Sequence, residues 1–165
     1  MRKYSFAAQV QIAKEIEDKL LEYYATLKEY VNVVDVRYDK DFQGMDIDFM
    51  LVKEDNPHFN FEMLEVKADF KTHKTGNLFI ELGEKGWLNK TRCDRLLYVD
   101  VENKVGYYIH CFYLKEYIHE NKGELVEKQV GTTDFGGFIT TGVLLPIDSI
   151  KDEDWVTTIN LTKVL

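Results

Sequence analysis

Two carboxylates and a lysine in the middle of the chain have the types and spacing to hold a divalent cation and cut a phosphodiester bond. They are Asp46 in GMDIDF, and Glu65 and Lys67 in LEVKA. Because side chains alternate across a β-strand, Glu65 and Lys67 project from the same face. Mg²⁺ (or Mn²⁺) takes oxygen ligands, and Mg²⁺ usually needs only one or two carboxylates besides water and substrate phosphate. The pattern therefore predicts a metal site at Asp46 and Glu65.

The expected chemistry at this site is hydrolysis. A bound cation lowers the pKa of a coordinated water and neutralises charge on the phosphate oxygens during in-line attack. The Lys67 ammonium would hold the attacking water and the phosphate in register, or act as the general base if its pKa falls beside the metal. The Val66 carbonyl is a further possible ligand. Asp48 lies on the same face of the expected strand as Asp46 and is an alternative to it.

These residues need a helix and three strands to position them. A helix is expected over residues 6–30, and three strands over 31–37, 45–52 and 61–68 form an antiparallel meander. A polar turn over 39–44 and turn residues near 53–58 would connect the strands. Ser5 is the expected N-cap. The helix is indicated by apolar residues recurring at intervals of three and four, namely Ile12, Ile16, Leu20, Tyr23 and Leu27.

The remaining chain predicts shorter elements. Residues 77–82 alternate as a strand, and a loop with a short helix near its end follows over 83–94. Two apolar segments flank ENK (102–104), a three-residue connection typical of a hairpin. Residues 113–121 are helical in type. Beyond them the pattern indicates strands or loops, including a glycine-rich loop or hairpin turn at 131–142.

Composition limits the class of protein. A chain of 165 residues with 45% hydrophobic residues and two prolines is expected to form one domain, 1–165. Charged residues interrupt its first apolar stretch, so we expect no membrane span and a cytoplasmic location. Cys93 and Cys111 lack the paired spacing of a structural zinc site and are expected to be ordinary thiols. The four histidines show no metal spacing, and none is assigned to catalysis.

The charge is unevenly distributed along the chain. The net charge of −8 argues against a generic nucleic-acid binder. Residues 35–65 hold nine acidic and three basic side chains, whereas residues 71–95 hold six basic and three acidic ones. An acidic segment followed by a basic one suits a metal site beside a phosphate-binding rim. Two solvated surfaces of opposite sign would give the same pattern.

Asp46 followed by Glu65-x-Lys67, each on an apolar β pattern, resembles the PD-(D/E)XK nuclease superfamily. The resemblance covers residues 6–101 and implies an α/β fold: a restriction-endonuclease-like core with a central mixed β-sheet flanked by helices in αβββαβ order. It also implies that Asp46 is preferred over Asp48, because the family aspartate commonly follows Gly-x and Asp46 follows Gly44-Met45.

A second resemblance covers TGNLFIE (75–81) and GWLNKTRCDRLLYV (86–99), which are similar to the stretch after Glu-x-Lys in phage and bacterial members. It implies that Glu81 is an additional site carboxylate and Asn77 a positioning residue. It places three residues near the DNA backbone: Lys90, Thr91 and Arg92. Alternatively, Glu81 is a solvated strand end, and Asn77 serves the turn after Gly76.

Members of the superfamily often carry a glutamate on the first helix that reaches the metal through water. The candidates here are Glu15, Glu17 and Glu22, and the helical phase favours Glu17. An ordinary solvated helix face is the alternative.

The resemblance as a whole implies a Mg²⁺- or Mn²⁺-dependent deoxyribonuclease of phage or bacterial type. Its partner would be DNA, and because the basic segment is short, a homodimer or a partner protein would extend the grip. The competing hypotheses are an inactive acidic interaction protein or DNA mimic on the same fold, and a nuclease that cuts RNA. The intact set of Asp46, Glu65 and Lys67 favours the enzyme.

Overall fold

The structure is a computed structural model that describes residues 4–53, 61–83, 86–132 and 138–165. Its helices are α1 (Phe6–Thr26), α2 (Lys40–Gln43), α3 (Thr72–Thr75), α4 (Trp87–Lys90), α5 (Cys111–Asn121) and the 3₁₀ helix η1 (Ile147–Ser149). Its strands are β1 (Tyr30–Asp35), β2 (Phe49–Lys53), β3 (Phe61–Asp69), β4 (Asn77–Glu81), β5 (Arg95–Asp100), β6 (Val105–His110), β7 (Val126–Thr132), β8 (Phe138–Pro146) and β9 (Val156–Asn160).

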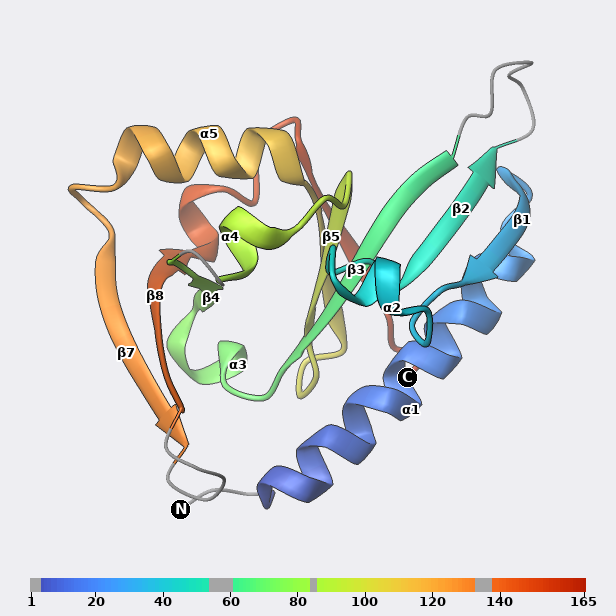
Figure 1. Cartoon of the computed structure of the whole chain (residues 1–165), viewed down its shortest axis with the longest axis horizontal. Coiled ribbons are helices and arrows are strands. Elements are labelled where there is room, and N and C mark those ends of the chain that lie inside the picture. The colour runs from blue at the N-terminus through green and yellow to red at the C-terminus, as the bar shows by residue number, and fades with distance from the viewer. Residues whose placement is uncertain (1–3, 54–60, 84–85, 133–137) are drawn as a thin grey trace.

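The strands form two sheets (Figure 1). The larger sheet has six strands in the order β1-β2-β3-β5-β6-β9, and the smaller has three in the order β4-β8-β7. The pair β3–β5 is parallel and all other neighbours are antiparallel, so the larger sheet is mixed. The prediction of an α/β fold with a central mixed sheet and helices is confirmed at this level.

The larger sheet buries a different layer on each face. Leu64 and Val66 of β3 belong to the core cluster that α1 covers with Ile16, Leu20 and Tyr24. The opposite face packs against the smaller sheet and α5, in the cluster that contains Leu96 and Tyr98 of β5. Figure 1 shows α1 on one side of the large sheet and β4, β7, β8 and α5 on the other. The odd-numbered residues of β3, including Glu65 and Lys67, therefore point away from the main contact with α1.

Helix α1 begins as predicted and ends earlier. The Ser5 side chain accepts a hydrogen bond from the Ala8 amide at 3.2 Å, which confirms it as the N-cap. The predicted end at residue 30 is wrong, since the helix stops at Thr26 and Leu27 is extended. The β-branched segment that follows enters the sheet as β1 at Tyr30.

The predicted meander of three antiparallel strands is confirmed as β1-β2-β3. The predicted strand over 45–52 is wrong at its start, because β2 begins only at Phe49. Before it the chain turns, and the amides of Met45 and Ile47 both donate to the Phe42 carbonyl, at 2.9 and 3.2 Å. The predicted turn at 39–44 contains the single-turn helix α2. Most of the second turn lies in 54–60, outside the described residues.

The chain after β3 departs from a simple αβββαβ order. Helix α3 follows β3, but β4 and α4 come before β5. The predicted strand over 77–82 exists as β4, yet it pairs with β8 in the smaller sheet. The short helix within 83–94 lies in its middle as α4, and the hairpin of β5 and β6 is confirmed.

Three further observations bear on the predictions. The glycine-rich segment at 131–142 overlaps the end of β7 and the start of β8, which are antiparallel neighbours, and its residues 133–137 lie outside the described part. Cys93 and Cys111 are buried free thiols with their Sγ atoms 3.1 Å apart. None of the described helices has the length and apolar character needed to cross a membrane.

Candidate functional site

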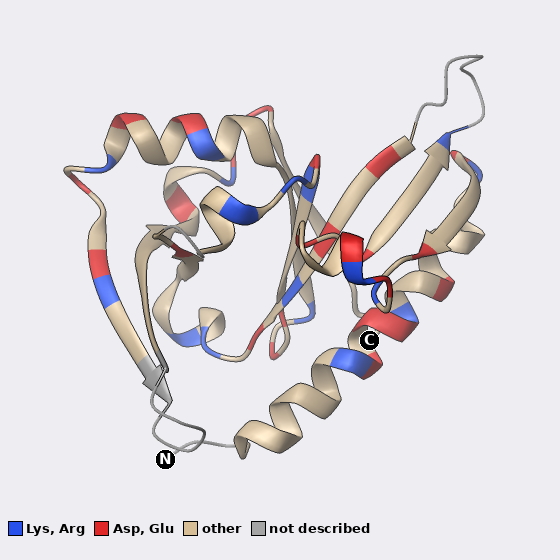
Figure 2. Ribbon diagram, in the orientation of Figure 1, with Lys and Arg blue, Asp and Glu red and all other residues tan. Residues whose placement is uncertain are grey.

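An acidic pocket of about 380 Å³ lies where the middle of α1 meets α2 and the chain leading into β2. Figure 2 shows acidic and basic segments gathered on these parts of α1 and α2. The pocket contains four carboxylates, and its lining residues are Lys14, Glu17, Arg37, Tyr38, Gln43, Asp46, Ile47, Asp48 and Glu65. The name "acidic pocket" is used below for this set.

Asp48 reaches the pocket from the position one residue before β2 begins. Strand β2 pairs with β3 only from Phe49, which lies opposite Leu64. One residue earlier, the Asp48 amide donates to the Leu64 carbonyl at 2.9 Å, and its Oδ2 accepts from the Val66 amide at 2.8 Å. The carboxylate therefore replaces a backbone acceptor at the edge of β3 and is fixed there.

Asp46 lies in the turn before β2, where its φ angle is +51°. Aspartate tolerates this left-handed region better than most non-glycine residues. Its Oδ1 atom lies 2.5 Å from Nζ of Lys90, and its carbonyl accepts a long hydrogen bond of 3.5 Å from the Thr91 hydroxyl. The expectation that Asp46 and Asp48 share a strand face is wrong, because neither residue lies within β2. Both nevertheless line the acidic pocket.

Each carboxylate in the acidic pocket makes the ionised form of its neighbours less favourable. Burial raises the pKa of Glu65 well above its ordinary value, and the neighbouring charges of Asp48 and Asp46 raise it further. Burial also raises the pKa of Asp48, partly offset by the Val66 amide, while the charge of Glu17 adds to the increase. Close carboxylates in a poorly hydrated place favour the binding of protons or of a cation.

Arg37 is the cation that the sequence reasoning missed. Its guanidinium lies 2.7 Å from Asp35, 2.8 Å from Asp18 and 3.3 Å from Glu17, and its side chain is only 7% exposed. In the sequence, the spacing Asp35-x-Arg37 just after an apolar strand is the pattern that could have indicated this ion pair. Arg37 offsets part of the negative charge on the α1 side of the pocket and holds Glu17 there.

Among the three glutamates predicted on the first helix, Glu17 lines the acidic pocket. Burial raises the pKa of Glu17, while the hydrogen bond from Arg37 opposes this shift. Glu15 is exposed and accepts a hydrogen bond from Gln11. Glu22 is exposed and lines a different hollow near the C terminus.

Lys67 and Glu81 meet beside the acidic pocket and do not line it. The Lys67 ammonium lies 3.3 Å from a carboxylate oxygen of Glu81, which projects from β4 of the smaller sheet. Lys67 also lowers the pKa of Glu65, but by less than burial and the charges of Asp48 and Asp46 raise it. The predicted set is thus divided: Asp46 and Glu65 line the pocket, while Lys67 is paired with Glu81 further along β3.

The three residues predicted near the DNA backbone have different environments. Lys90 pairs with Asp46 and also donates to the Gln43 carbonyl at 3.2 Å. Thr91 is fully buried, so its hydroxyl supports the turn. Arg92 is exposed, and its guanidinium donates to the carbonyls of Asn89 and Thr91 at 3.4 Å each.

Asn77 lies away from the acidic pocket. Its side-chain amide donates to the Thr75 carbonyl at 2.6 Å, across a turn in which Gly76 has a φ of +64°. This is the turn chemistry that the sequence offered as an alternative. Asn77 lines a separate small hollow together with Lys71 and Lys128.

The donor set of the acidic pocket suits a hard cation, because its acidic groups present only carboxylate oxygens. Within the described ranges, no group of three or more His, Cys, Asp or Glu side chains has the arrangement of a complete metal site. A Mg²⁺ ion usually takes only one or two carboxylates and completes its octahedron with water and substrate phosphate. Asp46 and Glu65 are two carboxylates that line the same pocket.

Comparisons of the chain with models of known protein families, with curated proteins and with solved structures gave no match.

Proposed function

We propose that this protein is a Mg²⁺- or Mn²⁺-dependent nuclease that hydrolyses DNA phosphodiester bonds at the acidic pocket, on a restriction-endonuclease-like core. One observation carries the proposal: Asp46, Asp48 and Glu65 line one pocket, and burial together with like charge raises the pKa of two of them, Asp48 and Glu65. Such an arrangement costs folding free energy unless a proton or a cation compensates the charge.

Asp46 and Glu65 are the proposed metal ligands. Bound there, a divalent cation supplies an activated water and neutralises charge on the scissile phosphate. Asp48 already uses one oxygen to accept from the Val66 amide, so its proposed role is to fix the edge of β3 and hence Glu65. Glu17, held by Arg37, would orient a water at the α1 side of the pocket.

Lys67 is the proposed group that orients the attacking water and the phosphate. It lies two residues after Glu65 on the same face of β3, and in this proposal its ammonium extends toward a phosphate held at the pocket. The ion pair with Glu81 at 3.3 Å limits where that ammonium can go. Glu81 is therefore proposed as a positioning residue that acts through Lys67.

Lys90 and Arg92 are the proposed contacts to the DNA backbone. Lys90 lies directly against Asp46, and the exposed Arg92 follows two residues later. Phosphate neutralisation by such cations supplies most non-specific affinity for nucleic acid. Because these contacts are few and the net charge of the chain is −8, a homodimer or a partner protein is proposed to extend the grip.

The test is a cleavage assay with the purified protein. Linear, circular, single-stranded and branched DNA are each incubated with Mg²⁺, with Mn²⁺ or with chelator. We expect metal-dependent cutting that falls by at least about 100-fold in Lys67→Ala and Asp46→Asn, the usual scale for a catalytic proton-transfer or ligand group. The matched control is Lys28→Ala, which removes an exposed lysine beyond the end of α1 and should cut normally. Equal cutting by wild type and both site variants would contradict the proposal.

A further inference from the structure

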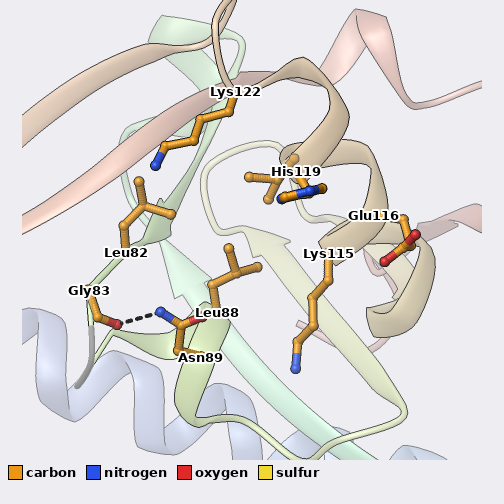
Figure 3. Close-up of a pocket in the computed structure, with 9 residues that line it drawn as sticks. Leu82, Gly83, Leu88, Asn89, Lys115, Glu116, His119 and Lys122 are labelled. Atoms are coloured by element: carbon orange, nitrogen blue, oxygen red, sulfur yellow. Dashed lines mark hydrogen bonds between the residues drawn. The ribbon is translucent and has the colours of Figure 1, made fainter.

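A second pocket, of about 370 Å³, lies between α4 and α5 (Figure 3). It falls within the range of roughly 300–1,000 Å³ that is usual for small-molecule sites. We call it the α4–α5 pocket, and its lining residues are Leu82, Gly83, Leu88, Asn89, Lys115, Glu116, Ile118, His119 and Lys122. None of them belongs to the acidic pocket.

The lining combines an apolar floor with a cationic rim. Leu82, Leu88 and the buried Ile118 supply the apolar surface. Figure 3 shows the Lys122 side chain extending toward Leu82, with the Lys115 side chain on another side of the opening. Glu116 also lines the pocket, and in the same view it lies across the opening from Leu82 and Lys122. A ligand with a flat apolar part and a negative group fits this distribution.

Asn89 adds a fixed polar group to the rim. Its side-chain nitrogen donates to the Gly83 carbonyl at 2.8 Å, which sets the orientation of the amide (Figure 3). A fixed amide oxygen is a suitable acceptor for the exocyclic amine or ring N–H of a nucleobase. Apolar walls with a few placed polar groups are the usual composition of a site that binds an organic ring.

The α4–α5 pocket is joined to the acidic pocket through the end of α4. Asn89 lines the former, and the next residue, Lys90, pairs with Asp46 in the latter. The Lys115 ammonium donates to the Thr91 carbonyl at 3.1 Å, and the Thr91 hydroxyl donates to the Asp46 carbonyl at 3.5 Å. A strand whose phosphate lay at Asp46 could therefore place a neighbouring nucleotide beside Asn89.

We infer that the α4–α5 pocket binds one unpaired nucleotide of the DNA strand that is cut at the acidic pocket. The base lies on Leu82, Leu88 and Ile118, and its phosphate lies beside Lys122 at the rim. A base within a duplex is stacked and paired and cannot enter such a pocket without being flipped out. This inference rests on the proposed nuclease function and narrows its substrate class to single-stranded DNA or unpaired ends.

The first test is direct binding in the presence of chelator, where no cleavage occurs. The probe is a fluorescein-labelled single strand of ten nucleotides, and affinity is measured by anisotropy over a range of salt concentrations. Lys122→Gln should bind about 5-fold more weakly, and its slope of log K against log salt should be smaller by about 0.7, the loss of one phosphate contact. Leu88→Glu should bind more weakly still, with circular dichroism checking that it folds.

The matched control is Lys28→Gln, which removes the same charge far from this pocket along the chain and should leave the slope unchanged. Lys122 is exposed, so its replacement does not depend on the outcome for Leu88. Affinity and salt slope equal to wild type in Lys122→Gln would overturn the inference.

The second test separates the base from the phosphate. Thymidine monophosphate and inorganic phosphate compete with the probe, and the nucleotide should displace it at a concentration at least about 10-fold lower, since only it can use the apolar floor. Equal displacement of the probe by the two competitors would overturn the inference that the pocket binds a base.

The two proposals fail in different ways. Weakened binding by Lys122→Gln without any metal-dependent cutting would contradict the nuclease alone. Metal-dependent cutting with normal binding by Lys122→Gln would contradict the nucleotide pocket alone.

Discussion

At the scale of the residue, the acidic pocket keeps carboxylates close together at a cost in folding free energy. The pKa values of Glu65, Asp48 and Glu17 are all raised, with burial as the largest cause in each case. Arg37 compensates on the α1 side, and Lys90 contacts Asp46 on the other. Glu65 forms no ion pair among the described residues, because its neighbour Lys67 is paired with Glu81. It is therefore the group whose charge most needs a ligand.

The raised pKa of Glu65 predicts a pH dependence of stability. In the folded protein Glu65 keeps its proton above the ordinary value of 4.5, whereas the unfolded chain releases it near that value. The unfolded state therefore binds fewer protons over this interval, and the free energy of unfolding falls as pH rises from about 4.5 toward the raised pKa. Urea unfolding at pH 5 and pH 8 in chelator should show this decline, and Glu65→Gln should reduce it.

The control for this measurement is Glu22→Gln, at an exposed position on α1. It should follow the wild-type dependence on pH. An equally steep decline in wild type and Glu65→Gln would show that Glu65 is charged and unstrained in the folded protein.

At the scale of the element, the periodicity of the sequence predicts the helices and strands that depend on residues close together in the chain. Short-range sequence predicts four features: the apolar repeat of α1, the cap at Ser5, the β5–β6 hairpin and the β1-β2-β3 meander. The start of β2 could not be predicted in this way, because the apolar alternation of MDIDFMLV continues through a turn that is set by contacts to Phe42 and Gln43. The placement of β4 could not be predicted either, because the alternation of a strand does not reveal which of two sheets will pair with it.

The edge of β3 gives a prediction about Asp48. Asp48→Ala leaves the Val66 amide without its acceptor and should lower the free energy of unfolding by about 1–3 kcal/mol. Asp48→Asn keeps an acceptor oxygen and removes a charge disfavoured by burial, so it should be as stable as wild type or more stable. Urea unfolding at pH 8 measures both. Equal losses in the two variants would contradict the structural role assigned to Asp48.

At the scale of the whole molecule, the site is assembled from segments distant in sequence. Glu65 and Lys67 were predictable as neighbours on one face, since the period of a strand is two residues. The approach of Glu17, Arg37 and Lys90 to the same pocket depends on how α1, the end of β1 and α4 pack around the large sheet. The pairing of Lys67 with Glu81 likewise requires the smaller sheet to lie over β3.

The arrangement also connects the two pockets. The end of α4 carries Asn89 into one and Lys90 into the other, so a single nucleic-acid strand could occupy both. In this account the acidic pocket performs hydrolysis and the α4–α5 pocket selects unpaired nucleotides. The proposed hydrolysis depends on a cation at the acidic pocket, whereas the proposed nucleotide binding does not.

Cation binding is therefore the most direct test of the central claim. Free Mn²⁺ is followed by electron paramagnetic resonance while it is titrated with protein at pH 8. We predict one Mn²⁺ site per chain in the wild type, with an affinity at least about 10-fold weaker in Asp46→Asn and in Glu65→Gln. We predict no change in affinity in Asp41→Asn, at an exposed position on α2. Binding of Mn²⁺ by Asp46→Asn and Glu65→Gln as strong as by the wild type would contradict the central claim.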